Sequence, residues 1–212
     1  MPNMNTRNTT KEETRIKLLE AALLDIRTYG YAATSVDTLC AEAGVSKGAF
    51  FHHFKSKEDL AVQAAEYFST MAQQLFKSAP YRKLEDPLDR LLGYVDFRIY
   101  LLQGSIPNFT CLLGTMVQEV HHSHPAIRIA CEKELAVHIK ELVADAAAAK
   151  ELYAPTAEWT PESLGYYMQS VLQGAFIFAK ANQDAKTAEE TLSHLRRYID
   201  LLYTVSTTAT VS

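Results

Sequence analysis

Apolar residues recur along the chain at the three- and four-residue spacing of amphipathic helices, and the alternating pattern of strands is nearly absent. The first stripe runs from Ile16 through Leu19 and Leu23 to Ile26, and Gly30 follows as a residue suited to a left-handed helix cap. The pattern therefore predicts an all-α fold. We expect helices over residues 10–30, 34–43, 46–54, 57–78, 85–103, 108–122, 125–151, 161–182 and 187–205.

Capping boxes mark the starts of four of these helices. A Ser or Thr followed three residues later by an acid can satisfy backbone amides that the first turn leaves unpaired. The four pairs are Thr10 with Glu13, Thr34 with Asp37, Ser56 with Asp59 and Thr187 with Glu190. Together they set the register of the predicted helices.

The N-terminal part has the organisation of a helix-turn-helix. Two short predicted helices, 34–43 and 46–54, are joined by a tight turn at Gly44 and follow a longer helix that can pack across both. The second short helix of such a unit can enter the major groove of DNA. We therefore expect a three-helix DNA-binding domain over residues 1–56 and a second helical domain, for ligand binding and dimerisation, over residues 57–212.

Composition supports a globular protein and restricts where nucleic acid can bind. With 48% hydrophobic residues in 212, the chain can bury a full core. With a formal net charge of -4, the chain as a whole lacks the basic character of many nucleic-acid-binding proteins. A local basic segment remains, because residues 44–57 contain Lys47, Lys55 and Lys57 and no acid. Further basic residues on the N-terminal arm and first helix are Arg7, Lys11, Arg15 and Lys17.

Cysteine spacing and hydropathy exclude other classes of protein. Cys40, Cys111 and Cys131 lie far apart, which argues against a disulfide framework or a zinc site and predicts reduced thiols. No apolar run approaches the ~18 residues that a membrane span needs, and residues 1–14 are polar. We expect a cytoplasmic protein with no membrane partner.

The residues of the helix-turn-helix are more specific than its geometry. Residues 34–60, TSVDTLCAEAGVSKGAFFHHFKSKEDL, closely resemble the DNA-binding segment of the TetR family of transcriptional regulators, TetR/AcrR-like proteins, and the resemblance covers about residues 10–65. It implies a homodimer that binds double-stranded palindromic operator DNA and represses transcription until a small-molecule effector occupies the C-terminal domain. We expect no cofactor.

The residues expected to face DNA lie on one side of the predicted helix 46–54. Val45, Phe50 and Phe54 fall on the other side and should bury against the preceding helices. Lys47 can reach a base edge or a phosphate, and a lysine in the first turn of the next helix can bind phosphate beside free amides. The expected DNA-binding residues are Thr34, Ser35, Ser46, Lys47, Gly48, Ala49, Phe51, His52, His53 and Lys57.

Two residues of this segment depart from what DNA binding favours. The family commonly has a tyrosine at the position of Phe51, so the missing hydroxyl removes one phosphate contact of ~1 kcal/mol. Asp37 would repel phosphates if it lay beside them. We interpret it as part of the N-terminal cap of its helix together with Thr34.

Aromatic residues crowd the C-terminal part. Most should be core, and some are expected to line a cavity for a small apolar or aromatic effector, because the region lacks a clustered basic site. Candidate cavity residues are Phe97, Tyr100, Cys111, Met116, Tyr166, Gln173 and Phe176. The last two helices are expected to form the dimer interface through Gly174, Ala175, Leu195, Tyr198, Ile199 and Leu202.

A histidine cluster leaves one alternative class open. His121, His122 and His124 invite a metal-dependent helical enzyme, but their place at a predicted helix end favours capping of free carbonyls. The sequence contains no nucleophile elbow and no phosphate-binding loop. We therefore expect no metal and no catalytic residues. A helical dimer that does not bind DNA is the other alternative.

Cys111 allows two interpretations. It opens a predicted helix, where the dipole and free amides favour a reactive thiolate that could sense electrophiles. The more usual role of a free cysteine is that of a small buried apolar residue.

Overall fold

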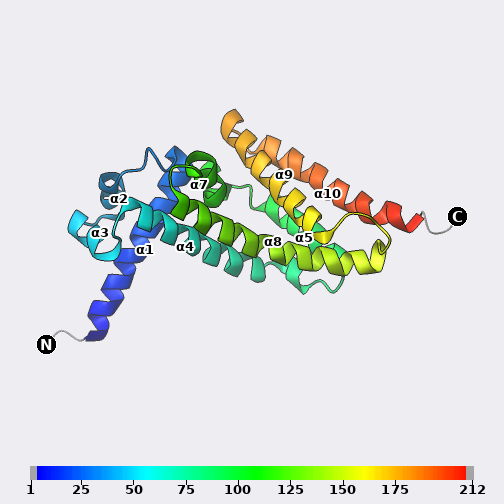
Figure 1. The fold of residues 1–212 in the computed structure, drawn as a ribbon, viewed down its shortest axis with the longest axis horizontal. Helices are drawn as coiled ribbons and strands as arrows, with labels where there is room; N and C mark the ends of the chain where they lie inside the picture. Colours follow the sequence, from blue (N-terminus) through cyan, green and yellow to red (C-terminus); the bar gives the residue numbers. More distant parts are fainter. Residues whose placement is uncertain (1–3, 209–212) are drawn as a thin grey trace. The chain divides into compact units, whose positions relative to one another are not determined.

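The computed structural model describes residues 4–208, with side-chain surroundings described for residues 11–204, and every regular element among them is a helix (Figure 1). The predicted all-α class is confirmed. Within these residues, no helix combines the length and apolar character that a membrane crossing requires. The helices are α1 (Met4–Tyr29), α2 (Val36–Ala43), α3 (Lys47–His53), α4 (Lys57–Lys77), the 3-10 turn η1 (Pro80–Lys83), α5 (Pro87–Tyr100), α6 (Ile106–Phe109), α7 (Leu112–Val120), α8 (Pro125–Tyr153), α9 (Pro161–Asn182) and α10 (Lys186–Thr208).

The chain forms two compact units, each built from two stretches of sequence. Unit 1 comprises the chain up to Met71 together with Cys111–Glu134, and unit 2 comprises Ala72–Thr110 and the chain from Leu135 onward. The division therefore passes through α4 and α8, and it groups α7 with the N-terminal helices. The compact units do not divide at residue 56. The boundary expected there, between a DNA-binding part and a ligand-binding part, therefore stays a prediction.

Unit 1 is held together by a core beneath the helix-turn-helix. α1 packs against α2, α3 and α7. Leu18, Leu19, Leu39 and Phe50 are each 0% exposed in this core. Burial of each side chain of this size contributes about 1.5–3 kcal/mol, so the core fixes the position of α3.

The predicted helix starts are confirmed at α4 and corrected at α1. Ser56 accepts a hydrogen bond from the Asp59 amide at 3.0 Å, as the capping box there predicts. The box at Thr10 and Glu13 is wrong as a helix start, because α1 begins at Met4.

Two predicted boundaries in the C-terminal part are also corrected. α10 begins at Lys186, whose amide donates to Asp184 Oδ1 at 3.0 Å, so the capping residue predicted at Thr187 lies two residues late. The helix predicted over 108–122 is divided into α6 and α7.

Unit 2 is built around α5, α9 and α10. α10 packs against both α9 and α5. The core of unit 2 includes Leu91, Val95 and Leu172, each at most 1% exposed. Gly165 allows α9 to approach α8 closely, since a Cβ there would lie 2.8 Å from Cγ2 of Val143.

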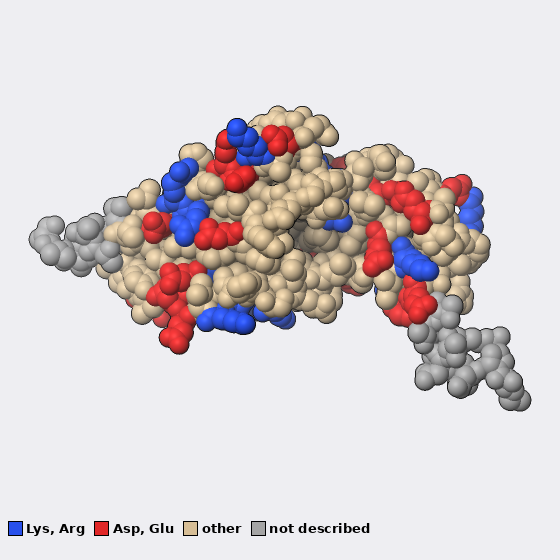
Figure 2. All heavy atoms as spheres, turned by 180° about the vertical axis from the view of Figure 1, so that it is seen from behind, with Lys and Arg blue, Asp and Glu red and all other residues tan. Residues whose placement is uncertain are grey.

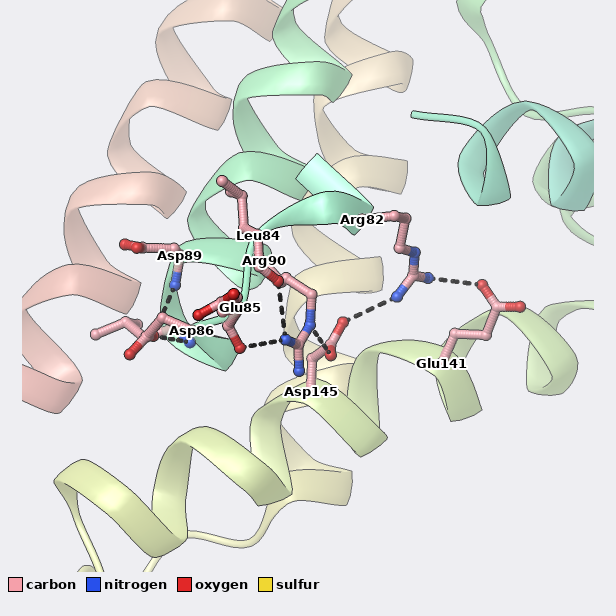
Figure 3. Close-up of polar contacts among 9 residues, drawn as sticks. Arg82, Leu84, Glu85, Asp86, Asp89, Arg90, Glu141 and Asp145 are labelled. Atoms are coloured by element: carbon pink, nitrogen blue, oxygen red, sulfur yellow. Dashed lines mark hydrogen bonds and ion pairs between the residues drawn. The ribbon is translucent and has the colours of Figure 1, made fainter. Parts of the chain in front are cut away.

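An ion-pair network ties the start of α5 to α8 within unit 2 (Figure 3). Arg82 of η1 donates to Glu141 at 2.9 Å and to Asp145 at 3.0 Å. Arg90 of α5 donates to Asp145 at 2.7 Å and to the Glu85 carbonyl at 2.8 Å. Two guanidinium groups thus face two carboxylates, and the charges of the network balance.

Candidate nucleic-acid interface

A tight turn between α2 and α3 sets the geometry of the helix-turn-helix. Gly44 adopts the left-handed conformation, with φ 64° and ψ 37°, which residues with a Cβ rarely adopt. Its amide donates to the Ala41 carbonyl at 3.2 Å. Ser46 then caps α3 by accepting a hydrogen bond from the Ala49 amide at 3.2 Å. Local sequence therefore determines both the end of α2 and the start of α3.

α3 has one buried and one exposed face. Phe50 and Phe54 are 0% and 1% exposed, as predicted, whereas Phe51 on the other side is 57% exposed. The remaining predicted DNA-facing residues of this segment are Ser46, Lys47, Gly48 and His52, which are exposed, and Ala49 and His53, which are half-buried. A short exposed helix face supported by a rigid core has the geometry needed to reach base edges in the major groove.

Lys47 is already engaged by an acid of α2. Its Nζ lies 2.6 Å from Oδ1 of Asp37, and the two side chains are 62% and 66% exposed. The hydrogen bond to this carboxylate, together with its charge, raises the pKa of Lys47. The capping role predicted for Asp37 is wrong, because Ser35 caps α2 and accepts a hydrogen bond from the Thr38 amide at 3.0 Å. DNA phosphates would therefore compete with Asp37 for the Lys47 ammonium group.

Thr34 is a wrong prediction as a DNA-binding residue. It is 2% exposed, and its hydroxyl donates to the Gly30 carbonyl at 2.8 Å. The hydroxyl is therefore used inside the loop. Ser35, the next residue, is exposed.

Lys57 holds the loop between α1 and α2, residues 30–35. Its Nζ donates to the carbonyls of Tyr31 at 3.0 Å and Thr34 at 2.9 Å, and it lies 4.2 Å from the centroid of the Tyr31 ring. Burial lowers the pKa of this lysine. Two of its three donors thus serve the loop, and a phosphate contact from Lys57 stays a prediction.

Glu119 of α7 holds the same loop from another element. Its carboxylate accepts hydrogen bonds from the amides of Tyr31 at 2.6 Å and Ala32 at 2.8 Å. Gly30 has φ +92°, and a Cβ there would lie 2.9 Å from Oε2 of Glu119, so both conformation and space favour glycine. Sequence reasoning missed this contact, since the partners lie 88 residues apart and no local pattern links them.

Basic groups of α1 lie near the end of α3. Burial, followed by the charges of His52, Lys11 and Arg15, lowers the pKa of His53, while Glu12 acts in the opposite direction. These groups supply positive charge locally. On the face shown in Figure 2, basic side chains in blue and acidic side chains in red are interspersed. Positive charge is therefore not spread over this face as a whole, and the basic residues near α3 form a local group.

The predicted effector residues do not belong to one compact unit. Cys111 and Met116 lie in unit 1, where Met116 is 0% exposed, and the other five lie in unit 2. Of these, Tyr100 and Tyr166 are 64% and 60% exposed, so they do not line a closed cavity of unit 2. Phe176 is buried against Phe109, with ring centroids 6.3 Å apart. Phe97 and Gln173 are half-buried.

Polar atoms without partners mark parts of unit 2 where a ligand could be held. Among the described residues, Oε1 of Gln169, Nε2 of Gln173 and Oγ1 of Thr110 are buried with no hydrogen-bond partner. A separate cleft of about 370 Å³ contains none of the predicted effector residues. Its walls are Ala147, Lys150, Glu151, Pro155 and Pro161.

Half of the predicted dimer residues are buried in the chain's own core. Ala175, Leu195 and Ile199 are 1%, 2% and 0% exposed, because α10 packs against α9 and α5 within one chain. These three predictions are wrong. Gly174 and Leu202 are half-buried, and Tyr198 is 44% exposed.

A different set of apolar side chains lies exposed on α9 and α10. The rings of Tyr167 and Tyr198 are 5.0 Å apart, so the two helices contribute to one surface, named here the α9–α10 face. Concentrations of exposed apolar side chains mark interaction surfaces. The face consists of Tyr166, Tyr167, Ile177, Phe178, Tyr198 and Leu201, each at least 44% exposed.

Of the three histidines after α7, His124 contacts the loop at Tyr31. The His124 and Tyr31 rings make an edge contact with centroids 4.9 Å apart, while His121 and His122 are exposed. In the part of the chain that the structure describes, no group of three or more His, Cys, Asp or Glu side chains is arranged to hold a metal ion.

Comparisons with known proteins agree with this geometry. Residues 18–64 match the family model described as bacterial regulatory proteins, tetR family. The chain is 24% identical over 164 residues to the HTH-type transcriptional repressor DhaR of Mycobacterium sp. (strain GP1), covering 77% of this chain and 81% of that protein. It is 36% identical over 66 residues to the HTH-type transcriptional regulator YerO of Bacillus subtilis, covering 31% of this chain but only 23% of that protein.

Solved structures share the fold over most of the chain. The reduced form of NemR from Escherichia coli has a TM-score of 0.75 at 23% identity, covering 87% of this chain and 95% of that one. A TetR transcriptional regulator from Chloroflexus aurantiacus has a TM-score of 0.79 at 21% identity, covering 91% and 96%. Fold and site are thus those of an all-helical protein with an N-terminal helix-turn-helix. Residues 18–64 resemble the DNA-binding segment of the tetR family of bacterial regulatory proteins, and most of the chain shares the fold of solved TetR-family structures.

Proposed function

We propose that the protein is a cytoplasmic homodimeric repressor that binds a palindromic operator through α3 of each chain and releases it when a small molecule binds in unit 2. The observation that supports this most directly is the exposed face of α3 above buried Phe50 and Phe54. A helix presented in this way can contact base edges in the major groove. A helical dimer that does not bind DNA would not require such an exposed helix.

The exposed side chains of α3 suggest how the operator is read. Lys47 can donate to a guanine edge or a phosphate, and His52 lies exposed on the same short helix. Phe51 offers an exposed ring that can contact a thymine methyl group or a sugar. Lys11 and Arg15 supply positive charge close to His53.

Dimerisation through the α9–α10 face would supply the two α3 helices that a palindrome requires. An isologous interface places the same patch of both chains in contact, and exposed apolar side chains suit such a contact. Leu201 and Phe178 are each 58% exposed there, so the interface would remove them from water.

Effector release can act through the loop that precedes α2. Lys57 of α4 and Glu119 of α7 both hold residues 30–35. The chain passes between the units inside α4, inside α8 and just before α7. A ligand-driven change in unit 2 that displaces these segments would therefore displace the loop and α3. A near-complete switch requires the ligand to prefer the non-binding conformation by about 5.5 kcal/mol.

Selection from a random duplex library tests DNA recognition. The purified protein should enrich a palindrome, and fluorescence anisotropy should show weaker binding by Lys47→Ala and His52→Ala, by about 1–3 kcal/mol for each lost base contact. Lys186→Ala is the matched control, because Lys186 is also an exposed lysine in an ion pair but lies on α10. Enrichment of no sequence, or equal binding by the α3 variants and the control, contradicts the proposal.

Sedimentation velocity tests the dimer interface. Leu201→Glu and Phe178→Glu should sediment as monomers and lose cooperative operator binding. Leu152→Glu is the control, because Leu152 is 64% exposed on α8, outside the α9–α10 face. Intact dimers of Leu201→Glu at concentrations near the dissociation constant of the parent count against this interface.

A further inference from the structure

An arginine of α5 lies among aromatic rings in unit 2. The Arg98 guanidinium carbon is 4.3 Å from the centroid of the Phe76 ring and 5.4 Å from that of Tyr94. Its Nε donates to the Tyr94 hydroxyl at 2.9 Å, and its Nη2 lies 3.2 Å from Nε2 of His138. Among the described residues no carboxylate pairs with Arg98, and its Nη1 makes no hydrogen bond.

His138 does not supply the missing negative charge. Burial, and then the charges of Arg98 and Arg82, lower the pKa of His138 to about 3, so the imidazole is neutral at physiological pH. Its Nε2 lies 2.8 Å from the Tyr94 hydroxyl, and this nitrogen therefore acts as an acceptor for its two neighbours. The direct contacts of Arg98 with Phe76, Tyr94 and His138 are thus all with neutral groups.

The neighbouring ion pairs leave the charge of Arg98 uncompensated. Arg82 and Arg90 are matched by Glu141 and Asp145, as Figure 3 shows, and Arg98 is not part of that network. Arg98 is half-buried, so its guanidinium group is partly accessible and has no counter-ion among the described residues, which leaves it available to an anionic ligand.

A buried hydroxyl without a partner lies in the same cluster. Tyr81 is 5% exposed, and its Oη has no hydrogen-bond partner among the described residues. Its ring centroid is 6.0 Å from those of Tyr94 and Phe97. Burial raises the pKa of Tyr81 to about 12, so the hydroxyl keeps its proton and remains a donor. Native structures contain few such unsatisfied groups, and binding sites are one place where they occur.

We propose that this cluster binds the carboxylate of a small monocarboxylic acid with an aromatic or apolar body. The fork of Arg98 matches two carboxylate oxygens, and the Tyr81 hydroxyl is a further donor. The rings of Phe76 and Phe97 provide the apolar contacts. One uncompensated cation suits one carboxylate rather than a phosphate or a dicarboxylate. The consequence that such an acid releases operator DNA rests on the proposed function, whereas its binding does not.

Matched acids and amides test the charge requirement. Thermal shift and titration calorimetry on the full chain would use benzoate, phenylacetate, cinnamate and hexanoate, each beside its uncharged amide. At least one acid should raise the melting temperature and bind at least tenfold more tightly than its amide. No response to any acid at millimolar concentration, or equal binding of acid and amide, overturns the inference.

Substitution of Arg98 separates ligand binding from a structural role. Arg98→Met should weaken acid binding at least 100-fold while leaving the melting temperature of the ligand-free protein unchanged or higher, because it removes an uncompensated cation. A structural arginine would show the reverse. Arg128→Gln, at an arginine that is 43% exposed and paired with Glu132, is the control and should bind acid like the parent. Retained acid binding by Arg98→Met overturns the inference.

A second variant keeps the inference testable if Arg98→Met does not fold. Tyr81→Phe removes only the unpartnered hydroxyl, so the ligand-free protein should be at least as stable and acid binding should weaken. Unchanged acid binding by Tyr81→Phe overturns the role of that hydroxyl. Operator binding is measured in parallel without acid. Operator binding without acid binding defeats this inference alone, and acid binding without operator binding defeats the proposed function alone.

Discussion

Asp37→Asn should make the protein bind its operator more tightly. In the parent, DNA must take the Lys47 ammonium group from a carboxylate 2.6 Å away. Exposed ion pairs of this kind contribute about 0.2–1 kcal/mol, so two DNA-binding heads together lose at most about 2 kcal/mol to this competition. Removing it should strengthen binding by up to about 30-fold. The dependence of affinity on salt should steepen by up to about 0.9 per head, because one more cation of each chain becomes available to phosphate.

Anisotropy titrations over a series of salt concentrations measure both quantities. Asparagine gives up the favourable interaction of an acid with the N-terminal dipole of α2, so a slightly lower melting temperature is expected. Glu132→Gln is the control, because it removes the same charge from unit 1 at an exposed ion pair on α8. If Asp37→Asn binds no more tightly than the parent, or Glu132→Gln gains as much, the competition between Asp37 and DNA is refuted.

The remaining predictions concern the loop, an acidic pair and the thiols of unit 1. Glu119→Gln should lower operator affinity and speed amide exchange at Tyr31, since a neutral amide binds the loop amides more weakly; exchange at the parent rate contradicts this. The pKa of Glu42 is raised by desolvation and then by Asp25, so the stability of the parent falls as pH rises through the folded-state pKa. Urea unfolding should therefore show the stability of Glu42→Gln relative to the parent increasing as pH rises above the ordinary glutamate pKa of about 4.3, and a constant difference refutes it. A thiol reagent should label Cys111 before the other two cysteines, which are 5% and 0% exposed; equal rates refute this order.

The helix-turn-helix could be predicted because its determinants are local. The helical spacing that buries Phe50 and Phe54, the left-handed Gly44 and the Ser46 cap all act within a few residues. The error in this segment was a shift of one residue in the position of a helix cap. Ser35 rather than Thr34 caps α2, and this shift of one residue buries Thr34.

Contacts between distant segments could not be predicted in the same way. No local pattern joins Glu119 to Tyr31, and Arg98 and Tyr81 come from different elements, so the sequence showed no clustered basic site. The prediction of the dimer residues was partly wrong for another reason. α9 and α10 carry apolar residues on more than one face, and periodicity does not tell which face packs inside the chain and which remains exposed. Ile199 proved to be core, and Leu201 proved to be surface.

The mass of the complex with the selected operator tests the central claim most directly. The claim is that two chains each place an α3 on one half of a palindrome, and analytical ultracentrifugation measures the number of chains on the duplex. The account predicts two chains per duplex, a smaller amount of this complex with Lys47→Ala at the same protein concentration, and none on a scrambled duplex at the same salt concentration. One chain per duplex, or equal complexes on the selected and the scrambled duplex, would contradict it.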